Sequence, residues 1–318
     1  MKNLLEVKNL KVYYYTREGV VKAVDQASFS IKKGETVGLV GESGSGKSTL
    51  GLSILKLVPS PGRIVGGELF FDGKDLAKLD NKQMRKLRGR WISMVFQDPM
   101  ASLNPLMRVG DHLTETIKTH EKVTHKDAEK RALLLLDEVG ISLERFKDYP
   151  HQFSGGMRQR VGIALAIALN PNLVIADEFT SSLDVIVQSQ ILSLMKNLKR
   201  SHNMGMILIS HDISLVSEIA DKVALMYAGQ IVEFAEVNAF FEEHLHPYSE
   251  RLLNSVPNIQ LSDQNLSYIP GMPPDLIHPL KGCRFYPRCS YATNTCREKE
   301  PPLVEIETGY MVKCFRYD

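Results

Sequence analysis

The chain begins with two stretches in which apolar and polar residues alternate, and it continues with short runs that are apolar throughout. Residues 4–15 and 22–31 alternate in the way that is typical of half-buried strands in an antiparallel sheet. Apolar runs bounded by turn residues are typical of strands that are buried on both faces. Four such runs follow: Val37–Val40, Trp91–Phe96, Leu173–Ala176 and Met206–Ile209.

Segments with helical periodicity lie between the buried runs. They cover residues 111–120, 126–139, 157–169 and 185–199. Ser154 stands where the third of these helices needs an N-cap. Because strands alternate with helices, the pattern predicts an α/β protein with a mainly parallel core sheet. Residues 59–67 are expected to form a loop that leads into a short strand over Glu68–Phe71.

The junction after Val37–Val40 carries a phosphate-binding pattern, Gly41-x-x-x-x-Gly46-Lys47-Ser48, and a helix-forming run follows it. Small residues let backbone N–H groups surround phosphates, and the positive end of the following helix faces them. Lys47 would neutralise the β and γ phosphates of a nucleoside triphosphate, and the Ser48 hydroxyl would hold Mg²⁺. The residues expected to bind the nucleotide here are Ser43, Gly44, Ser45, Gly46, Lys47, Ser48 and Thr49.

Polar side chains follow the other buried runs. Ligands of such sheets bind at the carboxyl ends of the strands, so one mouth is expected to collect Gly41, Gln97, Asp177, Glu178 and His211. Asp177 and Gln97 would complete the Mg²⁺ site with Ser48, and Glu178 would act as the general base that polarises water. His211 would hydrogen-bond the γ phosphate; a histidine after a strand is more often structural, and only the other elements favour the functional interpretation.

Composition adds limits to this picture. The chain has 318 residues, 43% hydrophobic and 24% charged, with a net charge of +2. These values are ordinary for a soluble globular protein and argue against a dedicated nucleic-acid binder. The N-terminus lacks a signal-peptide core, and no stretch approaches the roughly 18 apolar residues of a membrane span. The sequence therefore predicts a soluble, cytoplasmic protein.

Taken in order, the motifs resemble those of the ATP-binding subunits of ABC transporters. The matching segments are Gly41–Ser48, Gln97, the signature Phe153–Met157, Leu173–Glu178, Ser181–Asp184 and His211. The resemblance covers residues 1–255 and implies a P-loop NTPase with an ABC-type cassette: a mainly parallel core sheet, an N-terminal antiparallel β subdomain, and a helical subdomain inserted at about residues 98–160. Two departures are the signature Phe-Ser-Gly-Gly-Met and Phe179, where the family usually has proline.

The resemblance also implies how ATP is bound. Two ATP molecules would be enclosed in a dimer, each between the phosphate loop of one subunit and Ser154, Gly155 and Gly156 of the other. Asp184 would lie at the same interface. Tyr14 matches the family's adenine-stacking aromatic residue best, although aromatic clusters of this kind more often belong to the core.

Within the family, Phe153–Arg160 and the tail from His246 onward resemble dipeptide and oligopeptide importers, and the tail resembles the first (D-type) of their two ATPases. This implies ATP hydrolysis coupled to uptake of di- or oligopeptides through two membrane-spanning permease subunits, with an external substrate-binding protein acting indirectly. The expected partner is a paralogous second ATPase, with a homodimer possible in isolation, and no nucleic acid. The expected location is peripheral, on the cytoplasmic face of the plasma membrane. Alternatives are another cargo (nickel, glutathione or an oligosaccharide) or a soluble ABC ATPase outside transport.

The four cysteines, Cys283, Cys289, Cys296 and Cys314, all lie in the last 36 residues. Residues 256–318 are therefore predicted to form a small Cys-rich C-terminal domain. Thiols stay reduced in the cytosol, so a metal site is favoured over disulfides. Structural zinc sites usually contain one pair of ligands two to four residues apart, and no such pair is present. The spacing therefore favours a [4Fe–4S] cluster, with Zn²⁺ and free or paired thiols as the alternatives.

Overall fold

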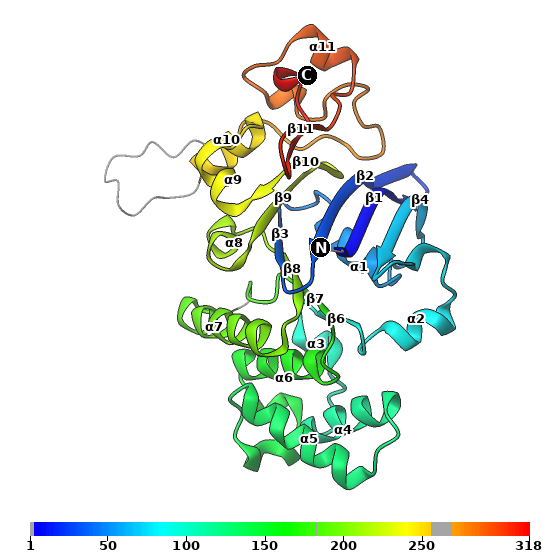
Figure 1. Cartoon of the computed structure of the whole chain (residues 1–318), viewed down its shortest axis with the longest axis vertical. Helices are drawn as coiled ribbons and strands as arrows, with labels where there is room; N and C mark the ends of the chain where they lie inside the picture. Colours follow the sequence, from blue (N-terminus) through cyan, green and yellow to red (C-terminus); the bar gives the residue numbers. More distant parts are fainter. Residues whose placement is uncertain (1–2, 182, 256–268) are drawn as a thin grey trace. The chain divides into compact units, whose positions relative to one another are not determined.

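The computed structural model describes residues 3–181, 183–255 and 269–318 of the chain (Figure 1). The chain divides into two compact units. The helical unit takes its described residues from 1–4, 32–35 and 78–209, and the P-loop unit takes them from 5–31, 36–77 and 210–318. The predicted domain division at residue 255, and the helical subdomain at about 98–160, stay predictions. Residues 256–268 of the predicted Cys-rich domain lie outside the described residues.

The P-loop unit contains most of the strands. Its strands are β1 (Asn3–Tyr15), β2 (Val20–Lys32), β3 (Thr36–Val40), β4 (Gly62–Phe71), β5 (Lys74–Asp75), β9 (Lys222–Tyr227), β10 (Gln230–Glu236), β11 (Val304–Glu307) and β12 (Tyr310–Val312). Its helices are α1 (Lys47–Ile54), α8 (Ile213–Ile219), α9 (Val237–Glu243), α10 (Pro247–Asn254) and α11 (Asn294–Glu298). Its 3₁₀ turns are η1 (Leu76–Lys78), η4 (Tyr286–Arg288) and η5 (Phe315–Tyr317).

The predicted N-terminal antiparallel sheet is present, with the strand order β2-β1-β4-β5. Burial alternates over the second half of β2, where Asp25, Ala27, Phe29 and Ile31 are buried, as the alternating pattern indicated. In β1, Leu10 and Val12 follow the same spacing. The expected loop over residues 59–67 is wrong in part, because β4 already begins at Gly62. Residues 62–66 pair with β1, where Tyr14 faces Gly62 and Lys11 faces Gly66. Glycines have a low strand propensity, so the sequence pattern did not indicate a strand here. The pairing with β1 compensates for this low propensity.

A second set of strands in the P-loop unit runs in the order β11-β12-β10-β9-β3. β3 and β9 are parallel, with Val37 opposite Lys222, whereas β9, β10, β12 and β11 are antiparallel to one another. Every residue of β3 and β9 is buried. β12 places Val312 opposite Glu233 of β10, so residues near the C-terminus extend a sheet that also contains the strand before the phosphate loop.

The helical unit contains three parallel strands, in the order β8-β7-β6. Its strands are β6 (Ile92–Val95), β7 (Leu173–Asp177) and β8 (Gly205–Ile209). Its helices are α2 (Asn81–Leu87), α3 (Pro99–Ser102), α4 (Val109–His120), α5 (His125–Glu138), α6 (Gly155–Ile167) and α7 (Val185–His202), with 3₁₀ turns η2 (Leu143–Lys147) and η3 (Pro150–Gln152). All residues of the three strands are buried, as expected for parallel strands covered on both faces.

The predicted helices are present with small shifts at their ends. The expected helices over 111–120 and 126–139 correspond to α4 and α5, which cover much of the lower part of Figure 1. The pair buries apolar residues at helical spacing, including Leu113, Ile117, Ala132 and Leu136. Across residues 3–181, 183–255 and 269–318, no helix has the length and apolar character that a membrane crossing requires.

Candidate functional site

The phosphate-binding pattern forms the turn between β3 and α1 in the P-loop unit. Gly41, Gly44 and Gly46 have φ of 148°, 76° and 103°, values that favour glycine. A Cβ atom on Gly41 would lie 2.0 Å from the carbonyl oxygen of Met226, and one on Gly46 would lie 2.0 Å from that of Ala23. Glycine at these two positions therefore allows the loop to pack against β9 and β2, which fixes its course around the start of α1.

Lys47 is folded back over the loop. Its side chain is buried, and Nζ donates hydrogen bonds to the carbonyl oxygens of Gly41 at 2.7 Å and Glu42 at 2.9 Å. These two bonds hold the ammonium group over the loop that the sequence assigns to the β and γ phosphates. Ser43 and Gly44 are exposed, whereas Ser48 and Thr49 are half-buried in the first turn of α1.

Tyr14, Ser45 and His211 are further site candidates of the P-loop unit. Tyr14 lies at the end of β1, with its hydroxyl oxygen 3.3 Å from Oγ1 of Thr49, so the predicted adenine-stacking residue stands beside the phosphate-loop helix. The Ser45 hydroxyl is buried and has no hydrogen-bond partner among the described residues. The exposed His211 also belongs to the P-loop unit, directly before Asp212, which caps α8 by accepting a 2.9 Å hydrogen bond from the N–H of Ser214.

The predicted carboxylates lie at the end of β7 in the helical unit. Asp177 is the last residue of the strand and is buried. The next residue, Glu178, has φ of +41°, which turns the chain out of the sheet, and its N–H donates to the carbonyl oxygen of Ile209 at 2.9 Å. Gln97 Nε2 donates to Oε2 of Glu178 at 3.2 Å. The structure therefore brings together Gln97 and Glu178, two residues that the sequence assigned to the same reaction.

Phe179 is one of the two departures from the family pattern. Its side chain is buried, and Ser181 closes the turn by donating from both N–H and Oγ to the carbonyl oxygen of Glu178, at 3.1 and 2.9 Å. The turn after the general-base candidate is therefore held by backbone contacts and by an apolar anchor in place of proline.

The signature segment forms the start of α6. Ser154 is the N-cap, and its Oγ accepts a 3.4 Å hydrogen bond from the N–H of Met157, as the sequence predicted. Ser154 and Gly155 are exposed. Gly156 packs against α7, because a Cβ atom there would lie 2.5 Å from Cγ1 of Val187. Asp184 caps α7 through a 3.0 Å hydrogen bond from the N–H of Val187, so it also has a structural role.

The predicted site residues are thus divided between the two compact units. The phosphate loop, Tyr14 and His211 belong to the P-loop unit. Gln97, Asp177, Glu178, Ser154, Gly155, Gly156 and Asp184 belong to the helical unit. The single mouth expected from the strand ends stays a prediction, and so does each residue's assigned role.

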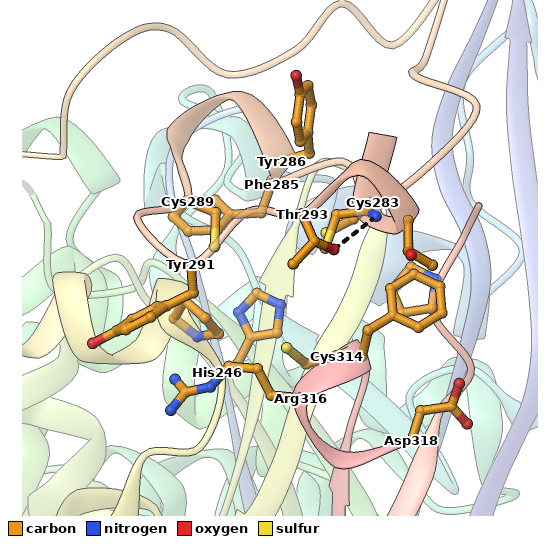
Figure 2. Close-up of a pocket in the computed structure, with 15 residues that line it drawn as sticks. His246, Cys283, Phe285, Tyr286, Cys289, Tyr291, Thr293, Cys314, Arg316 and Asp318 are labelled. Atoms are coloured by element: carbon orange, nitrogen blue, oxygen red, sulfur yellow. Dashed lines mark hydrogen bonds between the residues drawn. The ribbon is translucent and has the colours of Figure 1, made fainter. Parts of the chain in front are cut away.

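The four cysteines line one cavity of about 390 Å³ in the P-loop unit (Figure 2). None of them forms a disulfide, and all four are half-buried. Burial raises the pKa of the Cys283 thiol to about 11. Phe285, Tyr286 and Phe315 also line the cavity and give it aromatic walls. Among the described residues, no three His, Cys, Asp or Glu side chains are grouped closely enough to hold a single metal ion.

Sequence reasoning missed a set of contacts between the phosphate loop and the tail. Arg288 donates from Nη1 and Nη2 to the two carboxylate oxygens of Glu42, both at 2.8 Å. Tyr248 accepts a 2.9 Å hydrogen bond at its hydroxyl from the N–H of Glu42. Glu42 occupies a variable position of the phosphate-binding pattern, and Arg288 is 246 residues away, so no local signal could have joined them.

Comparison with protein families agrees with the motifs. The model of the ABC transporter family matches residues 24–181. A second model, described as the C-terminal region of oligopeptide/dipeptide transporters, matches residues 232–296. The chain is 49% identical over 314 residues to the oligopeptide transport ATP-binding protein OppD of Bacillus subtilis (strain 168), covering 98% of this chain and 88% of the relative. It is 45% identical over 313 residues to the dipeptide transport ATP-binding protein DppD of Escherichia coli (strain K12), covering 98% and 96%.

Solved structures show the same fold. One match is the dimeric structure of a post-hydrolysis state of the ATP-binding cassette MJ0796 bound to ADP and Pi. It has a TM-score of 0.65 and 28% identity, and the alignment covers 73% of this chain and 98% of that chain. Another is cbiO1 from Clostridium perfringens, described as part of the ABC transporter complex cbiONQ. Its TM-score is 0.67 at 27% identity, over 77% of this chain and 92% of that chain.

Proposed function

Because this chain belongs to the ATP-binding subunits of ABC transporters, we propose that it hydrolyses ATP to drive the uptake of di- or oligopeptides. The observation that carries the cargo class is the match of residues 232–296 to the C-terminal region of oligopeptide/dipeptide transporters. Relatives that are 45–49% identical over 98% of the chain bear oligopeptide or dipeptide transport names. This segment lies outside residues 24–181, which match the general ABC transporter model, so it distinguishes the branch.

The proposed chemistry assigns a separate task to each group. The start of α1 and Lys47 bind the β and γ phosphates, because N–H groups and an ammonium ion neutralise their charge. Ser48, Gln97 and Asp177 would hold Mg²⁺, which supplies charge neutralisation at the phosphates when bound. Their oxygen donors suit this cation. Glu178 accepts a proton from the attacking water as general base.

Other groups complete the proposed site. The hydrogen bond from Gln97 to Glu178 gives the carboxylate a fixed direction in the helical unit. His211 hydrogen-bonds the γ phosphate, and Tyr14 stacks on adenine beside Thr49. The exposed Ser154 and Gly155 at the start of α6 offer a hydroxyl and N–H groups to the γ phosphate of ATP held by a second cassette, with Gly156 and Asp184 at the same interface.

The proposed assembly contains one further ATPase of the same family and two membrane-spanning permease subunits. The solved cassette MJ0796 is dimeric in its ADP- and phosphate-bound state, which supports pairing of two cassettes. The chain would act at the cytoplasmic face of the plasma membrane, since its part is to supply ATP energy to the permeases. An external protein would deliver the peptide.

We also propose that Cys283, Cys289, Cys296 and Cys314 hold a [4Fe–4S] cluster. All four line one cavity of about 390 Å³, with apolar rings around them. A cubane takes one thiolate at each of four irons, so its ligands stand further apart than the ligands of a single ion. The cluster would have a structural or regulatory role, because the proposed ATP site does not require it.

Anaerobic purification tests the cluster. The protein should be brown and contain four irons per chain, as a cubane requires. Cys283→Ser should remove the colour. Colourless protein with one zinc per chain would exclude the iron–sulfur cluster and retain the four ligands.

Reconstitution tests the transport function. The chain, a partner ATPase and two permeases should be placed in proteoliposomes with a peptide-binding protein. Labelled di- and oligopeptides should enter in an ATP-dependent manner, and Glu178→Gln should abolish entry. Uptake of nickel, glutathione or an oligosaccharide without peptide uptake would refute the cargo class. An ATPase that associates with no permease would refute transport itself.

A further inference from the structure

Glu42 is held at each of its polar groups. Its carbonyl oxygen accepts from Lys47 Nζ at 2.9 Å, within the phosphate loop itself. Its N–H donates to the hydroxyl of Tyr248 on α10 at 2.9 Å. Its carboxylate receives both terminal nitrogens of Arg288 at 2.8 Å. Two of these three anchors come from the C-terminal part of the chain, which reaches directly into the loop that binds phosphate.

Arg288 is also held in place by residues other than Glu42. Its side chain is only 5% exposed. Nε donates to the carbonyl oxygen of Pro270 at 2.9 Å, and Nη1 also donates to the Tyr227 hydroxyl at 3.2 Å. Burial lowers the pKa of the guanidinium, but hydrogen bonds to Glu42 and Tyr227 outweigh this effect, and the pKa lies above its ordinary value. A buried bidentate pair of this kind is strong and specific in direction.

Arg288 belongs to the cysteine loop, which we define as residues 283–289. The loop begins at Cys283 and ends at Cys289, both of which line the cavity in Figure 2. Phe285 of the same loop packs edge-on against Tyr227, with ring centroids 5.2 Å apart. It also packs at a tilt against Tyr248, with ring centroids 5.4 Å apart. The two tyrosines that accompany the Glu42 contact are therefore packed against the cysteine loop as well.

A second arginine of the cysteine loop supports the other side of the phosphate loop. Arg284 donates to the carbonyl oxygen of Ala228 and to the carboxylate of Asp25. The N–H of Gly229, the residue after Ala228, donates to the carbonyl oxygen of Ser45 at 2.8 Å. The cysteine loop thus contacts the phosphate loop directly through Arg288 and through one intervening turn by way of Arg284.

We propose that Arg288 is a positioning residue of the phosphate loop, and that the folded cysteine loop thereby sets the affinity of this chain for nucleotide. The inference rests on the proposed role of the phosphate loop in binding ATP. A loop that contains Gly41, Gly44 and Gly46 has wide backbone freedom, and ordering it on binding costs affinity. Arg288 removes that freedom in advance by fixing Glu42, so the neighbouring N–H groups meet the phosphates in place.

The primary test measures the Kd of Mg-ATP for the full-length chain, without permeases. Arg288→Ala should raise Kd roughly tenfold, a coupling within the range typical of linked sites. Arg288→Lys keeps the charge but loses the bidentate geometry, so its Kd should lie between those of wild type and Arg288→Ala. The matched control is Arg297→Ala, an exposed arginine of the same C-terminal part, which should leave Kd at the wild-type value. In the reconstituted complex, Arg288→Ala should raise KM for ATP and leave kcat near wild type, because Arg288 is assigned no contact with the reacting groups.

A double-variant cycle separates positioning from general damage to the fold. If Arg288 acts through Glu42, then Arg288→Ala should add little to Kd in a Glu42→Gln background. Cys283→Ser and Cys289→Ser should also raise the Kd for Mg-ATP. In an Arg288→Ala background, either substitution should raise this Kd little further. Full additivity in either background, or an unchanged Kd in Arg288→Ala, would overturn the proposal.

Lys47→Ala keeps this test distinct from the test of the proposed function. If Lys47→Ala weakens ATP binding and Arg288→Ala leaves the Kd for ATP unchanged, only the positioning role fails. If Lys47→Ala binds ATP as wild type does, the phosphate-loop assignment fails first.

Discussion

Lys47 and Glu178 carry opposite charges and, on the proposed chemistry, serve different steps of ATP hydrolysis. Lys47 is buried over the phosphate loop, where its ammonium group holds two carbonyl oxygens. Glu178 stands after β7 with one carboxylate oxygen bonded to Gln97. The first residue should therefore determine whether ATP binds, and the second whether bound ATP reacts.

Glu178→Gln should separate binding from hydrolysis. Glutamine keeps the size of the side chain and removes the base, so kcat should fall by about 10²–10⁴-fold, the usual worth of a general base. The Kd for ATP should stay near wild type. Rates measured with the partner subunits present provide the check, with Glu144→Gln, an exposed carboxylate of the helical unit, as the control. Hydrolysis at the wild-type rate would exclude Glu178 as the base.

Lys47→Ala should weaken nucleotide binding itself. Hydrogen bonds to charged groups are worth about 1.5–3 kcal/mol, which corresponds to roughly a ten- to hundredfold rise in Kd. Fluorescence titration with a labelled nucleotide measures the change. Lys56→Ala is a suitable control, since this lysine follows α1 and donates to the carbonyl oxygen of Ala77 at 3.0 Å. Equal effects of the two substitutions would contradict a specific role for Lys47.

At the scale of elements, α10 begins at a histidine that burial keeps neutral. His246 is the N-cap of α10, and its Nδ1 accepts a 3.0 Å hydrogen bond from the N–H of Tyr248. Burial lowers the pKa of His246 from 6.5 to about 3. The unfolded chain therefore binds a proton between these two pH values that the folded chain does not bind. The free energy of unfolding should fall as the pH drops below about 6.5, and this contribution should level off near pH 3.

His246→Asn should make the fold less sensitive to acid. Asparagine retains a capping acceptor and has no group that titrates in this range. At pH 7.5 the variant should be less stable than wild type, because a buried ring is lost. The difference should shrink between pH 6 and pH 5, by up to about 1.4 kcal/mol per pH unit. Urea unfolding at several pH values gives the slopes, with exposed His278→Asn as the control. Parallel slopes for wild type and His246→Asn would disprove the assignment.

At the scale of the whole molecule, a single chain contains the parts of an ATP site but, on the proposed dimer, does not complete its own. On this proposal, the exposed start of α6 serves the site of the other subunit. The two signature glycines differ in what they tolerate. A Cβ atom on Gly156 would lie 2.5 Å from Val187, whereas one on Gly155 would meet Leu183 at 3.6 Å, an ordinary contact.

Gly155→Asp should therefore fold, bind ATP in its own phosphate loop, and inactivate the site on the partner. The added carboxylate would stand where the γ phosphate is expected and would repel it. The ATP Kd of the isolated variant should equal that of wild type, while the ATPase rate of the assembled complex should fall at least tenfold. The isolated wild-type chain should itself hydrolyse ATP slowly and gain activity from its partner. Full activity of the assembled Gly155→Asp complex would argue against the shared site.

The sequence predicted those parts of the fold whose signals are local. The phosphate loop, the buried strands β6, β7 and β8, and the cap at Ser154 follow from residue spacing and are present as expected. β4 was predicted too short, because glycines at 62, 66 and 67 hide a strand whose register is set by β1. β11 and β12 were missed because both are short and β11 is largely exposed.

The residues of the candidate site could be predicted from the sequence, but some of their contacts could not. Each residue with a family motif could be named, but the contacts of Glu42 with Arg288 and Tyr248 could not. Such contacts join positions far apart in the chain, and nothing in the local sequence around Glu42, Tyr248 or Arg288 indicates them. Tertiary packing alone creates them.

The pairing of β12 with β10 has a consequence for genetics. β10 is buried along nearly its whole length, and β12 covers its outer side. A nonsense mutation after residue 255 would leave the codons of every ATP-site motif intact, yet its product would leave β10 without its partner strand at Glu233 and Phe234. Unpaired strand edges pair with other chains and aggregate. Truncations after residue 255 should therefore behave as null alleles. Their protein products should be insoluble or degraded in the cell.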